Sequence, residues 1–314
     1  MFEVNKISKT YTPKVKDSNV LSDINFFIKP GEVFSILGKN GAGKSTLIKI
    51  LTTLLEADSG EVMYNGKNIK KILNKYKKSF GVVFERSDNM YDYLNIIENL
   101  LYFGGLSGLS NKYILERTNY LLDKFDLSEH KEKKLSHYSQ GMQQKAAIIN
   151  ALLHKPKLLF LDEPTLGLDV VSKRKIISEI KNLSREENIS ILLTSHQLDV
   201  VEEVADRLMI LSDHKIFFVG TVYDLKTKHS DNKWVIKIDK CKFIKKAVEK
   251  AFDHYKEIEN NDSIVIEVYD ELSHKELMQS ILNYNIEITS VSKEMNTLEN
   301  IMFDLLKEEA CLKY

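Results

Sequence analysis

The chain has 314 residues, of which 43% are hydrophobic and 29% charged, so it is long enough for a substantial core and two domains. Lys and Arg number 45, as do Asp and Glu, and this formal net charge of zero does not favour a nucleic-acid partner. The cysteines, Cys241 and Cys311, lack metal-ligand spacing, and no apolar run reaches the roughly 18 residues that cross a bilayer. The N-terminal residues do not form a signal peptide. We therefore expect a reducing, cytoplasmic setting, with any membrane spans supplied by another chain.

The first predicted elements are two strands. Residues Glu3–Ile7 alternate between apolar and polar side chains, and Val20–Ile28 forms a second strand-like segment before a turn at residues 29–31. Tyr11 follows the first strand. Two interpretations of this tyrosine stay open here: a half-buried strand residue, or an aromatic ring that stacks on a purine base.

Residues 38–46, Gly-Lys-Asn-Gly-Ala-Gly-Lys-Ser-Thr, fit the G-x-x-x-x-G-K-[ST] pattern of a loop that wraps nucleotide phosphates. They lie between a buried strand at Glu32–Leu37 and a helical segment at Leu47–Leu51. Glycines let successive N–H groups turn toward an anion, and the N-terminus of the helix attracts the same charge. We expect Lys44 to reach the β- and γ-phosphates and Ser45 to ligate Mg²⁺. The residues expected to hold the nucleotide here are Gly38, Asn40, Gly41, Ala42, Gly43, Lys44, Ser45 and Thr46.

After this loop the pattern changes from strands to helices. Residues Glu61–Gly66 predict one side of a hairpin with an Asn-Gly turn, and Phe80–Phe84 predicts a buried strand that ends at Glu85. From Tyr91 to His130, apolar residues recur at helical spacing. This change indicates a helical insertion in an α/β body.

A second candidate anion site follows. Ser139 and Gly141 come just before an apolar helix at Ala146–Leu153, where a helix N-terminus attracts negative charge. The alternative is an ordinary N-cap serine followed by a permissive glycine, and spacing alone favours that alternative.

The segment Lys157–Glu163 predicts a buried strand that ends in two adjacent carboxylates, at the edge where an open α/β sheet presents its chemistry. We expect Asp162 to hold Mg²⁺, directly or through water, and Glu163 to orient or deprotonate an attacking water. The alternative is an acidic turn at a strand end. A turn at Gly167–Asp169 follows.

One more buried strand is predicted at Ser190–Ser195, with His196 at its C-terminal end. A lone histidine is more often structural, but at this edge it could donate to a γ-phosphate.

Beyond a polar linker at residues 229–233, the chain alternates between short strands and helices without a catalytic constellation. The predicted strands are Trp234–Ile238, Ile264–Val268 and Ile286–Val291, and the predicted helices include Phe243–Tyr255, Leu277–Ile281 and Thr297–Glu308. Asn296 and Glu299 fit a capping pair for the last helix. Dimer contact, regulation or simple packing are all open roles for this small α/β unit.

Taken together, these segments resemble the ATP-binding-cassette (ABC) ATPases over roughly residues 2 to 228, in the family's own order. The motifs that carry the resemblance are the Walker A loop (38–46), the Walker B strand (158–162) with the catalytic glutamate Glu163, the signature (138–142), the D-loop (167–169), the switch histidine His196 and the adenine-stacking Tyr11. The resemblance implies an α/β P-loop NTPase fold in residues 1–228. It consists of a RecA-like core, an antiparallel β subdomain and a helical subdomain. A small α/β accessory domain in residues 229–314 follows.

The resemblance also implies partners. In this family two cassettes pair head to tail, and each ATP lies between one subunit's Walker A loop and the other's signature. ATP and Mg²⁺ are therefore the implied cofactors, and a second copy of the cassette, in a homodimer or heterodimer, is an implied partner. Ser139 and Gly141 would act on the partner's γ-phosphate, and Asp169 would also contact nucleotide. A separate multi-span permease would hold the chain at the cytoplasmic face of the membrane.

Three features depart from the family pattern. Lys39 stands where proline is frequent, and the signature reads Tyr-Ser-Gln-Gly-Met rather than Leu-Ser-Gly-Gly-Gln. Glu85 occupies the place of the Q-loop glutamine, which touches Mg²⁺ and senses the transmembrane partner. Glutamate keeps an oxygen ligand but adds a negative charge, so a tighter Mg²⁺ dependence is expected.

The stretch Glu85–Leu109 resembles bacterial exporter ATPases whose permease is a separate chain, and residues 229–314 resemble the accessory C-terminal domain of many such proteins. We therefore expect an exporter subunit. The competing hypothesis is a non-transport ABC ATPase that acts on ribosomes or DNA, although a single motif set, a short helical insertion and neutral charge argue against it. An immunity ATPase would share every motif.

Overall fold

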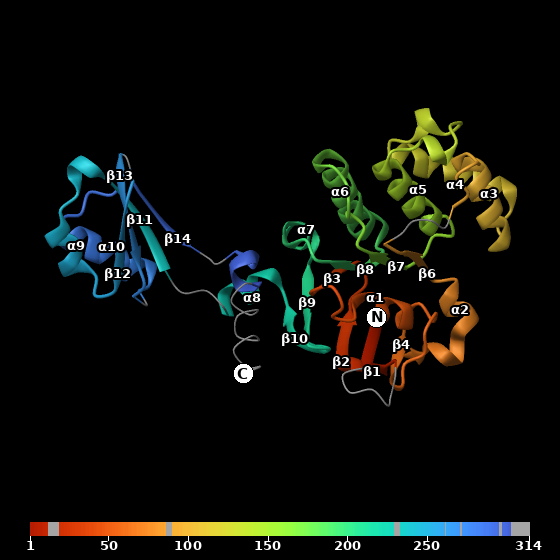
Figure 1. The fold of residues 1–314 in the computed structure, drawn as a ribbon, viewed down its shortest axis with the longest axis horizontal. Helices are drawn as coiled ribbons and strands as arrows, with labels where there is room; N and C mark the ends of the chain where they lie inside the picture. The colour runs from red at the N-terminus through yellow and green to blue at the C-terminus, as the bar shows by residue number, and fades with distance from the viewer. Residues whose placement is uncertain are drawn as a thin grey trace. The chain divides into compact units, whose positions relative to one another are not determined.

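The computed structural model describes residues 1–11, 19–85, 90–228, 233–260, 262–270, 272–294 and 297–302 (Figure 1). Asn296, Cys311 and the end of the last predicted helix lie outside the described residues. The chain divides into two compact units, Met1–Val222 and Tyr223–Tyr314. This division falls after the first residue of helix α8 (Val222–Lys228), whereas the sequence suggested a boundary after the whole helix, at residue 228. Within the described ranges, no helix combines the length and hydrophobicity that crossing a membrane requires.

The centre of the first unit is a six-stranded sheet in the order β10-β9-β3-β8-β7-β6. Its strands are β3 (Val33–Leu37), β6 (Phe80–Val83), β7 (Leu158–Asp162), β8 (Ser190–Ser195), β9 (Arg207–Ser212) and β10 (Lys215–Gly220). Neighbours run parallel except β10, which is antiparallel to β9. Because Leu37 pairs with Ser195 and Asp162 pairs with Thr194, the carboxyl ends of β3, β8 and β7 meet at one edge.

Both faces of this sheet are covered (Figure 1). On one face, Leu159, Leu161 and Leu193 pack into a core formed with three helices. These helices are α5 (Gln140–Leu152), α6 (Val170–Glu187) and α7 (Leu198–Val204). On the other face, Phe34 and Phe160 pack against α1 (Lys44–Leu51) and a second sheet. This double burial explains why the predicted strands are continuous apolar runs.

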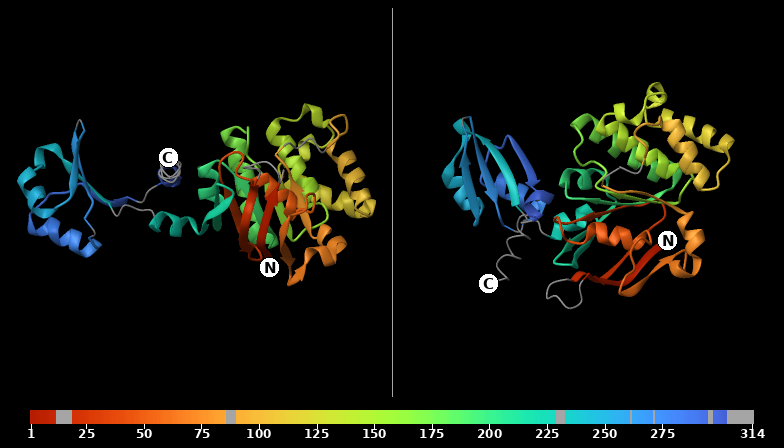
Figure 2. Two further views of the ribbon diagram at one scale, coloured as in Figure 1. Left: turned by 60° about the horizontal axis from the view of Figure 1, so that its bottom comes forward. Right: turned by 45° about the vertical axis from the view of Figure 1, so that its right-hand side comes forward.

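The second sheet is antiparallel, with four strands in the order β2-β1-β4-β5 (Figure 2). The elements of this layer are β1 (Phe2–Thr10), β2 (Asn19–Ile28), β4 (Ser59–Tyr64), β5 (Lys67–Asn68), the short 3₁₀ helix η1 (Ile69–Ile72) and α2 (Leu73–Lys77). The predicted hairpin turn is confirmed, because Asn65 and Gly66 have φ of 50° and 72°, as a two-residue turn between β4 and β5 requires.

The helical insertion is also confirmed. It contains α3 (Ile96–Leu106) and α4 (Asn111–Lys124), which pack with α5, and the 3₁₀ turns η2 (Ser128–His130) and η3 (Leu135–His137). Asn95 and Glu98 form a reciprocal capping box at the start of α3. The Ser110 side chain accepts from Tyr113 N at the start of α4.

The second unit contains an antiparallel sheet in the order β12-β13-β11-β14. Its elements in chain order are β11 (Lys233–Asp239), η4 (Lys240–Lys242), α9 (Lys245–Ala251), β12 (Tyr255–Glu259), β13 (Ser263–Val268), α10 (His274–Asn283) and β14 (Ser290–Glu294). Strand–helix–strand–strand–helix–strand in this order is the ferredoxin-like arrangement. The side chains of Trp234, Ile236 and Ile266 lie in its core with Leu277 of α10.

Two predictions for this unit were wrong in their bounds. The helix expected over residues 243–255 covers only Lys245–Ala251, because Tyr255 begins β12 and pairs with Val268 of β13. The strand expected over residues 286–291 begins later, at Ser290.

Candidate active site

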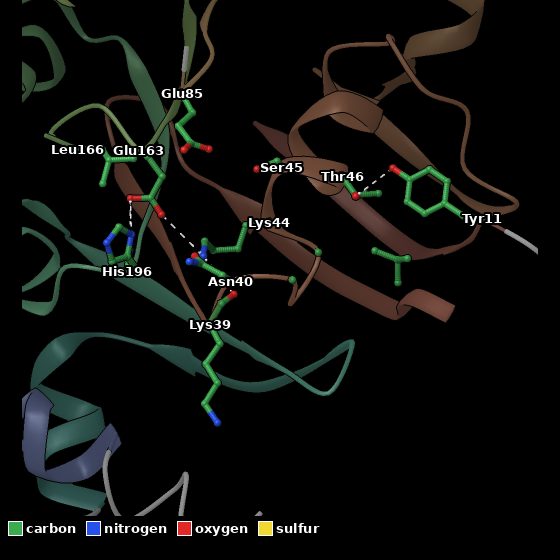
Figure 3. Close-up of a pocket in the computed structure, with 13 residues that line it drawn as sticks. Tyr11, Lys39, Asn40, Lys44, Ser45, Thr46, Glu85, Glu163, Leu166 and His196 are labelled. Atoms are coloured by element: carbon green, nitrogen blue, oxygen red, sulfur yellow. Dashed lines mark hydrogen bonds and ion pairs between the residues drawn. The ribbon is translucent and has the colours of Figure 1, made fainter. Parts of the chain in front are cut away.

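Polar side chains at the carboxyl edge of the central sheet line a cavity of about 620 Å³ (Figure 3). The loop between β3 and α1 forms its floor, and Glu163 and His196 enter from the ends of β7 and β8. Tyr11 and Glu85 come from segments that follow β1 and β6. The cavity therefore collects most of the residues that the sequence singled out.

The loop before α1 has a backbone that glycine alone adopts easily. Gly43 has φ of 103°, and a Cβ there would lie 2.6 Å from the carbonyl oxygen of Val20. Gly41 has φ of 85°. Because α1 begins at Lys44, the N–H groups of its first turn have no partner within the helix and are available to an anion. Asn40, Ser45 and Thr46 line the same cavity.

Lys44 lies at the centre of this loop. Its ammonium donates to the carbonyl oxygen of Gly38 at 2.7 Å and to that of Lys39 at 3.3 Å, and only 6% of the residue is exposed. The same Nζ atom lies 3.7 Å from Glu163 Oε1. The loop thus holds a buried positive charge beside the carboxylate at the end of β7. Ala42, also predicted for the loop, is buried.

The two carboxylates after β7 are both buried, with exposed fractions of 3% for Asp162 and 7% for Glu163. Glu163 Oε2 lies 3.0 Å from Nδ1 of His196, so the carboxylate lies between this imidazole and Lys44 (Figure 3). Asp162 Oδ1 accepts from the Thr194 hydroxyl at 2.5 Å. A solvated acidic turn, the alternative interpretation, does not fit this burial.

His196 is not a core histidine. Its side chain is 39% exposed, it lines the cavity, and its backbone N–H also donates to Glu163 Oε2 at 3.4 Å. The interpretation as a residue of the site is therefore the one that the geometry supports.

Tyr11 and Glu85 approach the cavity from outside the sheet edge. Tyr11 is 54% exposed, which rules out a half-buried strand residue, and its hydroxyl lies 3.1 Å from Thr46 Oγ1. Its ring stands at the opposite side of the loop from Glu163 (Figure 3). Glu85 is exposed and lines the cavity near Glu163.

Ser139, Gly141 and Asp169 do not line this cavity. The Ser139 side chain caps α5 by accepting from Met142 N at 3.3 Å, as the N-cap alternative proposed. Asp169 caps α6, and its hydrogen bonds from Ser172 and Val171 lower the pKa of the carboxyl. A Cβ on Gly141 would lie 2.7 Å from Ser172 Oγ, so the first turn of α5 lies against the start of α6.

Sequence reasoning missed Val20, Leu166 and Thr194. Val20 and Leu166 line the cavity as apolar side chains without a motif. Thr194 is buried behind it and touches both carboxylate positions. The only sequence signal for Thr194 is that it lies in the predicted strand Ser190–Ser195, which is the next strand along the chain after the one that ends at Asp162.

The donor set fits a hard cation bound together with phosphate. Ser45 and Glu85 line the cavity and offer oxygen ligands, and Asp162, which is buried at the end of β7, is a third candidate outside the lining. Among the described residues, however, no three His, Cys, Asp or Glu side chains gather into a metal site. A Mg²⁺ ion here would therefore depend on the Ser45 hydroxyl and on oxygens of a bound phosphate, as is usual for Mg²⁺.

Comparisons with known proteins agree with this geometry. Residues 21–166 match the ABC transporter family. The chain is 33% identical over 225 residues to the ABC transporter ATP-binding protein NatA of Bacillus subtilis, covering 72% of this chain and 91% of NatA. It is 35% identical over 225 residues to the linearmycin resistance ATP-binding protein LnrL of the same organism, covering 72% and 70%. It is 34% identical over 232 residues to the phosphonates import ATP-binding protein PhnC of Treponema denticola, covering 70% and 89%.

Solved structures with the same fold include an ATP-binding subunit of an ABC transporter, with a TM-score of 0.64, 32% identity, and coverage of 73% of this chain and 92% of that one. A second is cbiO1 from Clostridium perfringens, part of the ABC transporter complex cbiONQ, with a TM-score of 0.66, 27% identity, and coverage of 72% and 90%. A third is a dimeric ATP-binding cassette in a post-hydrolysis state with ADP and Pi, with a TM-score of 0.62, 27% identity, and coverage of 71% and 99%. The predicted ABC cassette fold is confirmed.

Proposed function

The chain belongs to the ABC transporter ATP-binding proteins, and on that premise we propose that it is the ATPase subunit of an exporter whose permease is a separate chain. The observation that carries the ATPase part of the proposal is the cavity in which Lys44, Glu163 and His196 meet beside a phosphate-type loop. Members of this family bind and hydrolyse ATP, so the chain is an ATPase.

In the proposed binding mode, the phosphates lie on the loop before α1. The free N–H groups at the start of α1 and the ammonium of Lys44 supply positive potential, and the ammonium leaves the carbonyls of Gly38 and Lys39 to meet the β- and γ-phosphates. Tyr11 is exposed at the side of the loop and stacks on the adenine. Ser45 and Glu85 of the cavity, together with Asp162 at the end of β7, would hold Mg²⁺, which would neutralise charge on the phosphates.

In this proposal Glu163 is the general base for hydrolysis. Its carboxylate is 7% exposed and is held by His196 on one oxygen and Lys44 on the other. It orients and deprotonates the attacking water, and His196 donates to the γ-phosphate. The low exposure strengthens these electrostatic interactions relative to bulk water.

A second cassette completes the site in this proposal. Ser139, Gly141 and Asp169 lie outside this chain's own cavity, at the starts of α5 and α6. Cassettes of the family form dimers, as the solved dimeric relative does. Ser139 and Gly141 of one copy would then face the γ-phosphate bound to the other, and two identical copies would suffice.

The proposed permease contact is the surface around α3. Tyr91 packs against Tyr93, Tyr102 and Phe103 with ring centroids 5.6, 5.2 and 5.9 Å apart. Tyr93 is 65% exposed and Leu106 is 70% exposed. Clustered exposed aromatic side chains are typical of protein interfaces. One solved relative, cbiO1, is part of an ABC transporter complex, cbiONQ. The surface would hold the chain at the cytoplasmic face of the membrane.

The direction of transport is inferred from two parts of the sequence. The segment Glu85–Leu109 and the accessory unit resemble exporter ATPases. The linearmycin resistance relative agrees with export, whereas the phosphonates relative is an import protein. We assign export because the segment Glu85–Leu109 resembles exporter ATPases.

A pull-down from native membranes tests the partner. We expect the tagged chain to retain a multi-span protein in near-equal amount, identified by mass. The double variant Tyr93→Asp/Leu106→Asp should lose it because charge disrupts the exposed aromatic surface, while Leu115→Asp, at another exposed leucine on α4, should keep it.

Two outcomes would contradict the proposal. Recovery of ribosomal proteins or nucleic acid without a permease would favour a non-transport ATPase. If inverted membrane vesicles containing the pair fail to accumulate the transported compound on addition of ATP, the direction is not export.

A further inference from the structure

Thr194 joins the two carboxylate-bearing residues at the end of β7. Its side chain is fully buried, and its hydroxyl donates to Asp162 Oδ1 at 2.5 Å. The same Oγ1 atom accepts the backbone N–H of Glu163 at 3.1 Å, beside a bond from that N–H to the Thr194 carbonyl oxygen at 3.2 Å. One hydroxyl group therefore contacts both residues.

We propose that Thr194 is a positioning residue for ATP hydrolysis, which orients the Asp162 carboxylate toward the cation and fixes the backbone that carries Glu163. The inference rests on the proposed function, because it assigns Thr194 a role in that reaction. Thr194 touches no reacting atom and acts only through its two neighbours.

The chemistry of a hydroxyl suits this double contact. A threonine hydroxyl has one donor and two acceptor lone pairs. Its single proton is used on Asp162 Oδ1, so that oxygen is fixed and Oδ2 is the one left to act as a metal ligand. A hydrogen bond to a charged oxygen is short and strong, which is consistent with the 2.5 Å distance.

The Glu163 backbone requires support. Its φ is 51°, in the left-handed region that a residue other than glycine adopts only when its surroundings impose it. The bonds from Glu163 N to Thr194 Oγ1 and O hold the amide in this conformation. The side chain then reaches His196 and Lys44 at 3.0 and 3.7 Å. A relaxed backbone would move the carboxylate away from both.

The test compares Thr194→Val, which keeps the shape but lacks the hydroxyl, with Thr194→Ser, which keeps the hydroxyl. We expect Thr194→Val to lower kcat at least about 10-fold, since small misplacements of a catalytic group are costly. It should also raise the Mg²⁺ concentration for half-maximal rate. The KM for ATP should change less than about threefold, because Lys44 and Tyr11 do not touch Thr194. Thr194→Ser should restore kcat.

Ser35→Ala is the matched control. Ser35 is a fully buried residue on the adjacent strand β3, and its hydroxyl has no hydrogen-bond partner among the described residues. Removing it should leave kcat and the Mg²⁺ dependence unchanged. If Ser35→Ala lost as much kcat as Thr194→Val, the loss would come from removing any polar group from the core. That result would overturn the inference.

Other outcomes separate the two proposals. Wild-type kcat in Thr194→Val, or in Thr194→Ala if the valine variant does not fold, defeats the positioning role. Failure of Thr194→Ser to restore kcat also defeats it. A wild-type protein without Mg²⁺-dependent ATP hydrolysis would instead defeat the proposed site chemistry itself.

Discussion

Glu163 shows how the fold prepares one side chain for chemistry. Its backbone is held in the left-handed region, its carboxylate is almost fully buried, and its two oxygens face different nitrogen atoms. These nitrogens belong to Lys44 and His196, which come from separate segments of the chain. A buried carboxylate with fixed partners is a strong candidate for general-base catalysis.

Replacing Glu163 by Gln should therefore separate binding from hydrolysis. The amide keeps the size of the side chain but cannot accept a proton, so we expect ATP hydrolysis to fall by about 100-fold or more. ATP binding should persist and favour a dimer, measurable by size-exclusion chromatography with ATP. Hydrolysis at the wild-type rate in this variant would remove Glu163 from the role of base.

The residues of the site could be predicted where the signal is local. The spacing of residues 38–46 identified the loop, and the two carboxylates after an apolar run identified the end of β7. Thr194 could not be predicted in this way, because its contacts depend on the pairing of β8 with β7. The positions of Ser139 and Asp169 outside the cavity likewise depend on tertiary packing.

At the scale of elements, the carboxylate of Glu187 links helix α4 of the helical insertion to helix α6, which packs on the central sheet. Glu187, the last residue of α6, accepts from Lys124 Nζ at 2.9 Å and from Arg117 at 3.2 Å, both on α4. Burial raises the pKa of Glu187, but the hydrogen bonds and charges of Lys124 and Arg117 outweigh that effect and lower it. The ion pairs therefore stabilise the contact between α4 and α6.

The variant Glu187→Gln should lose about 1 kcal/mol of stability at neutral pH, a value discounted for solvent screening. Because the folded pKa lies below the ordinary 4.5, the contribution is present above that value and disappears as the pH falls through the folded pKa. Chemical denaturation of both proteins at pH 7 and pH 4 measures the difference. A gap that is constant over this range would show that Glu187 acts by packing alone.

Helices and strands could be predicted where apolar residues recur with one period over a long stretch of the chain. The helices α3 and α4 follow from apolar residues at helical spacing. The segment from Phe243 to Tyr255 shows the limit, because apolar residues at i+4 steps also fit a short helix followed by a strand. Tertiary pairing with β13 decides that Tyr255 is extended.

At the scale of the whole molecule, each of the two units has a core of its own. The second unit buries Ile236, Ile266 and Leu277 around its own sheet, and the first unit buries a larger set on both faces of its central sheet. A unit with its own core can lose stability without unfolding its neighbour.

Ile266→Ala should cost about 3 kcal/mol, since it opens a cavity in a fully buried site. Limited proteolysis with mass analysis should show cleavage after residue 222, while ATP hydrolysis is retained. Ile180→Ala, at a buried position of α6 in the first unit, should instead shorten the lifetime of the ATPase on heating. Loss of hydrolysis in Ile266→Ala at low temperature would show that the two cores depend on each other.

Trp234 is the single tryptophan of the chain and lies in the core of the second unit, where its indole N–H donates to the carbonyl oxygen of Leu272 at 3.0 Å. No tryptophan is among the described residues that line the cavity beside residues 38–46. Indole fluorescence therefore originates from one known position, far along the chain from residues 38–46. The protein carries a built-in optical probe: a change in its emission during nucleotide titration would reveal that the second unit senses the occupancy of the first.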